Sequence, residues 1–382
     1  MKTPISQDQF EVAIVGGGLA GLSLSILCAR AGYKTILFEK EKYPFHKVCG
    51  EYVSLESWDF ITDLGLDLSG LHLPIIKKLM VTSPGGKFLS SSLDQGGFGI
   101  SRYLLDNELK KIAEAKGVTV CDGVKVEEVS LRGDLFTMQF QNANLQAKIV
   151  AGCFGKRSNL DVKWKRPFTL KKHGKLNNYL GIKYHIKADF PEDTIALHNF
   201  KDGYCGISKI ENDQYCLCYL TRAQNLRDSH NQISIMEKIV LQQNPLLKKI
   251  FSESAFLFEA PVTISQISFD KKLPVENHLL MLGDAAGMIA PLCGNGMSMA
   301  MHSAKLAFQK MDMFLTNKIS RQDMERGYAE VWNHHFSKRL QAGRRIQALF
   351  GNPTGTDIFI SLLRYFPGLI KKFIRSTHGK AF

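Results

Sequence analysis

The alternation of apolar and polar positions near the start of the chain predicts a strand, a helix and a second strand. An apolar run over 12–15 is followed by a helix-like run that ends at Ala31, and a second apolar run covers 35–38. Short continuous apolar runs are typical of strands buried on both faces of a parallel sheet, and two such strands need a crossover helix. The first forty residues are therefore expected to form one strand–helix–strand unit.

Beyond this unit the patterns predict further strands and one clear helix. Residues 76–100 alternate and contain glycine-rich turn signals, as short antiparallel strands do. Residues 103–116 place apolar side chains on one helical face, and Gly117 ends that helix. Residues 176–270 are rich in β-branched and aromatic residues, which favours an antiparallel sheet. The other expected elements are strands at 118–121, 125–129 and 136–140, a return to the first unit at 149–158, a buried parallel strand at 278–282, and helices from 297 with breaks at 351–353 and 366–368.

Composition narrows the class of protein. The chain has 382 residues, 45% of them hydrophobic, so a large core is expected in two domains or in one domain with a large insertion, and disorder is not expected. The net charge is +13, with basic clusters at 163–175 and after Asp357, but no nucleic-acid motif accompanies them, so no nucleic-acid partner is expected. The eight cysteines are scattered without a CxxC pair, and Cys216 and Cys218 share one face of a strand, so no metal site is expected.

A glycine-rich motif links the first predicted strand to the helix. Gly16 permits a tight turn, Gly18 leaves space for a pyrophosphate beside the backbone, and Gly21 lets the helix pack closely on the strand. The helix N-terminus offers N–H groups to the phosphates. Glu39 ends the second strand 18 residues after Gly21, near the spacing of about 20 expected for an acid that binds a ribose hydroxyl. The motif predicts a dinucleotide site that also includes Leu19, Ala20 and Lys40.

A second glycine-rich segment, 283–297, indicates which dinucleotide binds. Asp284 follows a predicted parallel strand, at the edge where ligands of such sheets bind, and its carboxylate suits a polyhydroxyl chain. A helix begins near Met297, and its N-terminus favours the negative charge of a reduced flavin. The two segments together predict non-covalently bound FAD. The predicted contacts of this segment are Asp284, Gly287, Pro291, Gly294, Asn295, Gly296 and Met297.

These elements predict an α/β fold in which a Rossmann-like FAD-binding domain carries an inserted antiparallel β-sheet substrate domain and C-terminal helices. The FAD-binding domain is expected to be discontinuous in the sequence. The expected boundaries are 1–75, 98–165 and 271–330 for the FAD-binding domain, 76–97 and 166–270 for the substrate or lid domain, and 331–382 for the C-terminal helical segment.

With these motifs in order along about the whole chain, the sequence resembles the FAD-dependent oxidoreductase superfamily of para-hydroxybenzoate hydroxylase type. The resemblance is closest to the geranylgeranyl reductase-like branch, through the motif KVCGE at 47–51, through Arg102 with Asp106, and through the segment 283–297. It implies that Cys49 and Gly50 lie against the isoalloxazine ring. It also implies that Arg102 lies near the ribityl chain and the pyrophosphate.

Departures from the superfamily's patterns bear on the reaction. Phe154 stands where the aromatic hydroxylases carry the acid of an Asp-Gly pair, which disfavours NADPH use in the hydroxylase manner. The tryptophan pattern of flavin-dependent halogenases is absent, which disfavours halogenation. No second strand–GxGxxG–helix unit is found for a stably bound nicotinamide, so electrons are expected from transiently bound NAD(P)H, from a separate reductase or from the substrate itself.

The expected function is FAD-dependent oxidation or reduction of a hydrophobic small molecule of isoprenoid, polyketide or aromatic type, as in a geranylgeranyl reductase-like enzyme. A monooxygenase that uses NAD(P)H and O2 is the alternative, and a non-catalytic flavin-bearing lipid-binding or electron-carrier protein is a third. In a reductase, Cys49 and Glu51 are the nearest candidates for a catalytic proton donor. The alternative is a structural thiol and a glutamate that accepts hydrogen bonds from backbone N–H groups.

The C-terminal segment is both apolar and basic between 358 and 374. One interpretation is an interfacial helix that meets a membrane surface and admits a lipid substrate. The other is a helix packed on the protein's own core with a solvated basic edge. No leader peptide and no apolar run of transmembrane length is found, so a cytoplasmic protein is expected, with peripheral contact at the inner membrane surface left open.

Overall fold

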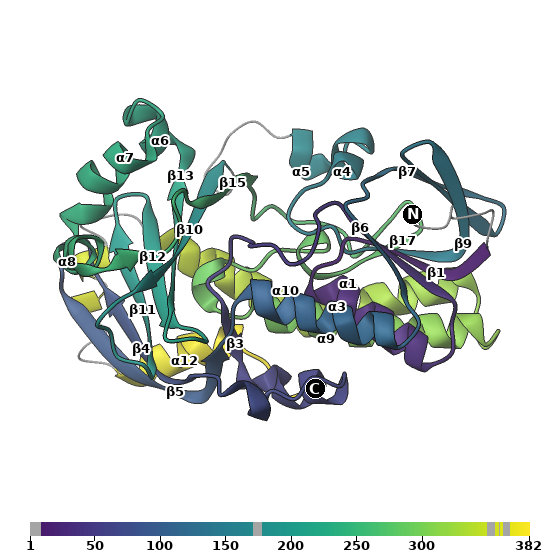
Figure 1. Cartoon of the computed structure of the whole chain (residues 1–382), viewed down its shortest axis with the longest axis horizontal. Coiled ribbons are helices and arrows are strands. Elements are labelled where there is room, and N and C mark those ends of the chain that lie inside the picture. The colour runs from purple at the N-terminus through teal and green to yellow at the C-terminus, as the bar shows by residue number, and fades with distance from the viewer. Residues whose placement is uncertain (1–8, 171–177, 350–355, 359, 362–366) are drawn as a thin grey trace.

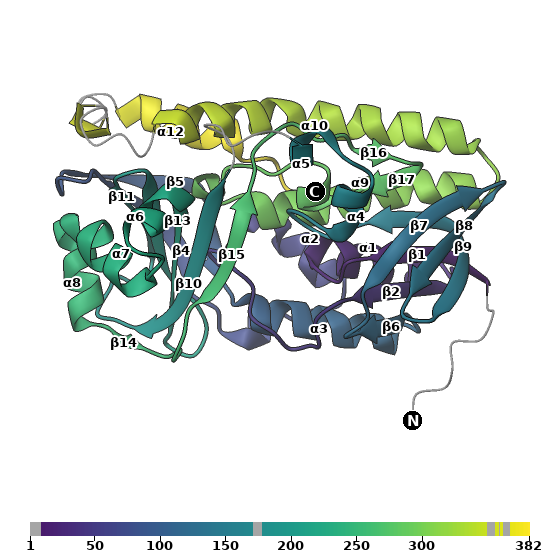
Figure 2. The ribbon, with the colours of Figure 1, turned by 90° about the horizontal axis from the view of Figure 1, so that it is seen from above.

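The chain folds into two sheets that lie side by side, with a long helix, α10 (Arg321–Leu349), running past both (Figure 1, Figure 2). The computed structural model describes residues 9–170, 178–349, 356–358, 360, 361 and 367–382. The α/β class predicted from the sequence, with a Rossmann-like unit and a second sheet, is confirmed.

The first sheet is parallel at its centre, as the continuous apolar runs predicted. β1 pairs in parallel with β2 and with β9, and β17 pairs in parallel with β9. The carboxyl ends of these strands therefore lie at one edge of the sheet, where ligands of such sheets bind. The strands of this sheet are β1 (Gln9–Val15), β2 (Thr35–Glu39), β6 (Thr119–Asp122), β7 (Val126–Arg132), β8 (Leu135–Phe140), β9 (Ala143–Gly152), β16 (Val275–Glu276) and β17 (Leu279–Met281).

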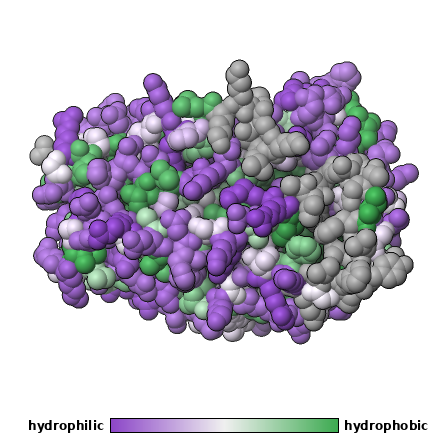
Figure 3. All heavy atoms as spheres, turned by 180° about the vertical axis from the view of Figure 1, so that it is seen from behind, coloured by the Kyte–Doolittle hydropathy of each residue, from purple (hydrophilic) through white to green (hydrophobic). Residues whose placement is uncertain are grey.

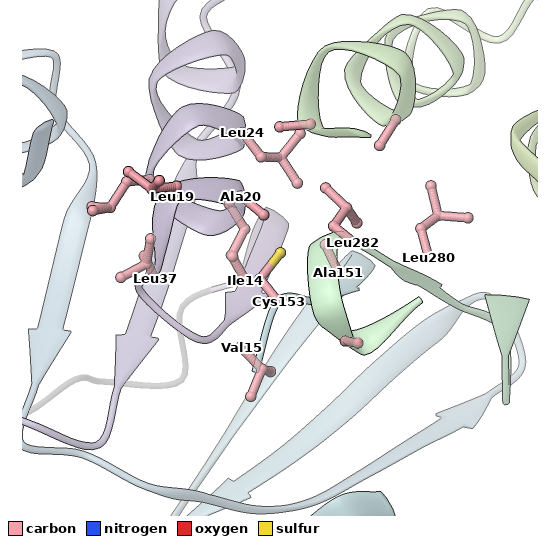
Figure 4. Packing of buried hydrophobic residues seen from close by; sticks show 14 of the residues in the cluster. Ile14, Val15, Leu19, Ala20, Leu24, Leu37, Ala151, Cys153, Leu280 and Leu282 are labelled. Atoms are coloured by element: carbon pink, nitrogen blue, oxygen red, sulfur yellow. The ribbon is translucent and has the colours of Figure 1, made fainter. Parts of the chain in front are cut away.

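Helix α1 covers one face of this sheet and buries its core. Figure 4 shows Ala20 and Leu24 of α1 beside Ile14 of β1, with Leu282 on the far side of the same cluster. Helices α3 and α9 pack on either side of α1. Some helices pack on the second sheet and are given with it below. The others are α1 (Leu19–Arg30), α2 (Trp58–Asp63), α3 (Arg102–Ala115), α4 (Asn159–Lys163), α5 (Pro167–Leu170), α9 (Gly296–Leu315), α10 (Arg321–Leu349) and α12 (Pro367–Thr377), with short 3-10 turns η1 (Leu55–Ser57), η2 (Ser69–Leu71), η4 (Gly283–Ala285) and η5 (Pro291–Cys293).

The second sheet is mostly antiparallel, although β4 pairs in parallel with β11. Ile182 and Leu217 on one of its faces pack against Met236 and Leu247 of a helical layer. The sequence had assigned this region to strands alone, because its aromatic and β-branched composition outweighed the helical signal. The strands are β3 (Tyr52–Ser54), β4 (Ile75–Thr82), β5 (Phe88–Gly99), β10 (Tyr179–Lys187), β11 (Thr194–Phe200), β12 (Gly203–Lys209), β13 (Tyr215–Arg222), β14 (Ala255–Phe256) and β15 (Val262–Ile267), and the helical layer is α6 (Ala223–Asp228), α7 (Ile233–Ile239), η3 (Leu241–Gln243) and α8 (Pro245–Glu253).

Three expected domain boundaries fall inside elements: 75/76 in β4, 97/98 in β5 and 330/331 in α10. β3, which the sequence placed in the FAD-binding domain, pairs with β5 in the second sheet. The expected boundary at 330/331 falls inside α10, which is continuous because its apolar side packs along α9. The predicted break at 351–353 and part of the apolar C-terminal run, 359 and 362–366, lie outside the described residues, as do the lysines of 171–177.

No helix within the described ranges is both long and apolar enough to cross a membrane. The face drawn in Figure 3 is mostly hydrophilic, with hydrophobic positions in small scattered groups. Isolated exposed apolar side chains are ordinary on protein surfaces and indicate no partner.

Candidate functional site

The first glycine motif forms the turn between β1 and α1. Gly16 has a φ of 108°, a conformation that favours glycine, and a side chain at Gly21 would collide with the carbonyl oxygen of Gly16. Among the described residues, a side chain at Gly18 would instead meet Arg102 at 3.6 Å and Lys47 at 3.8 Å. No side chain caps the N-terminus of α1. Gly18 therefore borders a space that contains two cations and free helix N–H groups, which suits phosphates.

Glu39, at the end of β2, lies beside the glycine turn. Its carboxylate is 7% exposed and accepts hydrogen bonds from the backbone N–H groups of Gly17, at 2.9 Å, and Glu41, at 3.2 Å. Lys47 Nζ lies 3.7 Å from Glu39 and 3.1 Å from Asp106. Lys47 was not among the predicted contacts, although it lies in the motif KVCGE. Lys40, which was among the predicted contacts, has an exposed side chain that pairs with Glu41.

Arg102 begins α3 beside the same space. Its guanidinium donates two hydrogen bonds of 2.7 Å to Asp106, one helical turn later. Burial alone would raise the pKa of the Asp106 carboxyl, but Arg102 and Lys47 outweigh burial and lower this pKa. The pair thus fixes a guanidinium in position at the edge of the site, as Arg–carboxylate pairs do.

The second glycine segment lies against the first. A side chain at Gly283 would contact Ala20 of α1 at 3.5 Å, so the two motifs meet. Asp284 lies in η4, and its carbonyl accepts a hydrogen bond of 2.7 Å from the buried Lys272. Pro291 begins η5. At Gly287 a side chain would be 2.9 Å from Trp332, so this glycine serves the packing of α10.

The end of this segment leads directly into α9. Gly294 has a φ of 65°, and Asn295 precedes the helix without capping it through its side chain. The Oδ1 atom of Asn295 is buried and has no protein partner among the described residues, and a side chain at Gly296 would meet nothing closer than 3.7 Å. Met297 is buried in the first turn of α9. This combination leaves a free acceptor and an uncapped helix N-terminus at one end of the site.

The loop that contains Cys49, Gly50 and Glu51 is held by the second sheet. Cys216 Sγ donates to the carbonyl of Cys49 at 3.2 Å, and Ser208 Oγ donates to the carbonyl of Gly50 at 3.3 Å. Cys49 is half-buried, and a Cβ atom built at Gly50 has no atom of another described residue within 4 Å apart from its two chain neighbours. The loop therefore presents an open backbone position between the two sheets.

Glu51 is the centre of a buried charge cluster. Its carboxylate accepts hydrogen bonds from Lys183 Nζ at 2.5 Å, His185 Nε2 at 2.7 Å and the backbone N–H of Arg102 at 2.7 Å. Burial alone would raise the pKa of Glu51, but Lys183 and then His185 outweigh it and bring this pKa to about 2. Glu51 is consequently ionised at neutral pH, and both of its oxygens are occupied.

The same cluster contains a set of atoms with metal-ligand chemistry. Ligand atoms of Glu51, His185 and Cys216 lie within 4.8 Å of one another. The ammonium of Lys183 already contacts the carboxylate, and a second cation there would be repelled by it. We therefore assign no metal to this cluster.

An apolar cavity of about 110 Å³ lies between the second sheet and α12. One side is formed by β4, β5 and β11, and another by Tyr52 of β3 with the residues that end η5. The lining residues are Tyr52, Leu79, Val81, Leu89, Leu93, Ile195, Leu197, Leu292, Cys293, Gly294, Ile346, Ile360, Ile370, Phe373, Ile374, Thr377 and His378. The sequence did not reveal this cavity, because its walls come from five separate stretches of the chain.

The geometry as a whole fits FAD. Two cations and the N-terminus of α1 suit the pyrophosphate, and Glu39 lies where an acid binds the adenosine ribose. The open position at Gly50, the free Oδ1 of Asn295 and the N-terminus of α9 are available for the flavin end. The protein binds FAD as its cofactor.

Comparison with known proteins gives the relationships of the chain. A family model described as the FAD binding domain matches residues 9–330. The conditioned medium factor receptor 1 of Dictyostelium discoideum is 23% identical over 381 residues, which cover 87% of this chain and 69% of the receptor. The digeranylgeranylglycerophospholipid reductase of Methanocaldococcus jannaschii is 25% identical over 78% of this chain and 76% of the reductase.

A solved structure of a flavin-dependent brominase matches with a TM-score of 0.75 and 18% identity, over 98% of this chain and 94% of the brominase. At this identity the match shows the fold alone. The names of the similar proteins range from receptor to reductase, monooxygenase and halogenase. They agree on the fold and differ in activity, so the reaction has to be argued from the site.

Proposed function

The chain belongs to the FAD binding domain family and is a FAD-dependent oxidoreductase, and we propose that it reduces a carbon–carbon double bond in a hydrophobic, isoprenoid-type molecule. The observation that carries the proposal is the position of the apolar cavity. Leu292, Cys293 and Gly294, which lie within the flavin segment 283–297, form part of its wall. A substrate in this cavity would lie against the part of the protein that holds the flavin.

The composition of the cavity supports an aliphatic substrate. Its walls on the sheet are Leu, Ile and Val side chains, and the polar groups that line it are confined to Tyr52, Thr377 and His378. Burial of apolar surface gives roughly 25 cal/mol per Å², so a long hydrocarbon chain binds well in such a space without a specific polar contact. The similarity to an archaeal lipid reductase supports the same substrate class.

Phe154 supports reduction over hydroxylation. Its ring is half-buried and packs edge-on against Trp164, with ring centroids 6.4 Å apart. An apolar ring therefore occupies the position at which the aromatic hydroxylases carry an acid associated with nicotinamide binding. Electrons then come from transiently bound NAD(P)H in another orientation, or from a separate reductase.

Each residue of the site has a task in this reaction. FAD, when bound, supplies the hydride. Lys47 and Arg102 bind and orient the pyrophosphate, and the apolar walls of the cavity exclude water. Cys49 Sγ donates the proton that completes the reduction and regains one from solvent. Glu51, which is ionised, positions the Cys49 loop and does not act as the acid.

The test is direct reoxidation of the reduced protein by an alkene. The FAD-loaded protein is photoreduced without oxygen and mixed with geranylgeraniol or with its fully saturated analogue, and the return of oxidised-flavin absorbance is followed. We expect return with the alkene alone. Leu197→Trp, which fills the cavity, should slow this return at least tenfold, whereas Leu257→Trp at an exposed position should not. No return with the alkene, together with a long-lived absorbance transient on mixing with oxygen, favours the monooxygenase.

We also propose peripheral contact between α12 and an anionic membrane. Lys372 is exposed on this helix, and Lys380 is exposed beyond its end, while apolar α12 side chains line the cavity. The double variant Lys372→Glu/Lys380→Glu should float less with phosphatidylserine-containing liposomes than the parent protein. Equal flotation contradicts the membrane contact and leaves the reductase proposal untouched.

A further inference from the structure

Glu56 forms hydrogen bonds both to the flavin segment and to the C-terminal segment that borders the apolar cavity. It lies in η1 and is 1% exposed. One carboxylate oxygen accepts a hydrogen bond of 2.9 Å from Asn295 Nδ2, in the flavin segment, and the other accepts one of 2.6 Å from the backbone N–H of Gly379. Arg339 of α10 lies 4.0 Å from the first oxygen. A single buried carboxylate thus bridges residues 239 and 323 positions away in the sequence.

The Gly379 end belongs to the roof of the apolar cavity. Residues 367–382, which we call the roof, comprise α12 and the five residues after it. Ile370, Ile374 and His378 of the roof line the cavity. Beyond Gly379, the Phe382 ring stacks on His302 of α9, with centroids 4.2 Å apart and planes within 7°. The roof is therefore attached at two points to the elements that surround the flavin site.

The Asn295 end belongs to the flavin site. Asn295 follows Gly294, a cavity wall residue, and precedes α9, whose N-terminus faces the flavin end. Its Nδ2 is held by Glu56, which aims the other amide atom, Oδ1, away from this carboxylate. That Oδ1 is buried and has no protein partner among the described residues. A movement of Glu56 would therefore reorient a side chain that is free to contact the cofactor.

We propose that Glu56 is a positioning residue that couples occupancy of the apolar cavity to the binding of FAD. This inference rests on the proposed function, because it takes the cavity to be the substrate site. A ligand in the cavity contacts both the roof and the wall at Gly294, and so orders the two partners of Glu56 together. Each ligand then binds more tightly in the presence of the other, by the same factor, as linkage requires.

The experiment measures this factor with oxidised flavin, so that no turnover occurs. The apoprotein is titrated with FAD in the presence and absence of farnesol, and farnesol binding is measured by equilibrium dialysis with and without FAD. We expect farnesol to tighten FAD binding about fivefold or more, and FAD to tighten farnesol binding equally.

Glu56→Gln should reduce the factor to about one while both ligands still bind. The amide can accept from either Asn295 or Gly379, but its NH2 group then faces the other donor. Gly379→Ala provides a second variant from the roof side, because the added methyl would displace the Arg339 guanidinium, which lies 4.0 Å from Glu56. The control, Glu253→Gln, changes an exposed glutamate of α8 and should retain the full factor.

The outcomes separate the two proposals. If farnesol binds the parent protein and does not change its affinity for FAD, the coupling is refuted and the reductase proposal stands. An unchanged factor in both Glu56→Gln and Gly379→Ala refutes the role of Glu56. If farnesol does not bind at all, the substrate class is wrong and the coupling falls with it.

Discussion

Replacing Lys183 with methionine should lower the free energy of unfolding by about 3–5 kcal/mol, because it leaves the Glu51 carboxylate buried without its cation. Lys183 and Glu51 are both 0% exposed, so water cannot take the place of the missing ammonium. His185 and the N–H of Arg102 remain, but neither supplies a fixed positive charge.

An exposed ion pair in the second sheet provides a matched control for the loss of unfolding free energy in Lys183→Met. Lys78 of β4 pairs with Asp193 at 2.9 Å, with side chains 59% and 40% exposed. An exposed pair contributes about 0–1 kcal/mol, so Lys78→Met should change the unfolding free energy by no more than that. The double variant Glu51→Gln/Lys183→Met removes both charges and should recover most of the loss.

The assay is urea unfolding followed by circular dichroism at several pH values. The pKa of Glu51 is about 2 in the folded protein, below its ordinary value of 4.5. Its ionised form therefore stabilises the fold fully above pH 4.5, by about 3 kcal/mol, and this contribution is lost as the pH falls toward 2. The difference between the parent and Lys183→Met should shrink over the same range. If Lys183→Met loses no more unfolding free energy at pH 7 than Lys78→Met does, this account of the Glu51 cluster is refuted.

Three further predictions concern the cofactor site and the reaction. Gly21→Ala should abolish FAD binding, because the methyl collides with the Gly16 carbonyl; bound FAD in the purified variant would contradict this. Arg102→Met should weaken FAD binding about 10- to 100-fold in a fluorescence titration, the effect of one charge-assisted hydrogen bond, and an unchanged affinity would place the guanidinium outside the site. Cys49→Ala should retain FAD but slow reoxidation by an alkene strongly, and unchanged reoxidation would exclude the thiol as the proton donor.

The local motifs were readable from the sequence because their physics is local. The turn at Gly16 needs a positive φ, and the approach of α1 to that turn needs a residue without a side chain at Gly21; both demands fall on residues a few positions apart. The same holds for the periodicity of α3, predicted at 103–116 and found at Arg102–Ala115. Gly287 shows the limit: its neighbours are on α10, so its glycine serves helix packing that no local pattern reveals.

The sequence by itself therefore determined the class of fold and the cofactor. Only the tertiary structure decided the state of Glu51, because its charge depends on Lys183, 132 positions away. It also decided the cavity, whose walls come from the second sheet, from the end of η5 and from α12, and the bridge made by Glu56 to the roof. Charge and burial depend on neighbours in space, and long-range neighbours are fixed only when the sheets and helices have packed together.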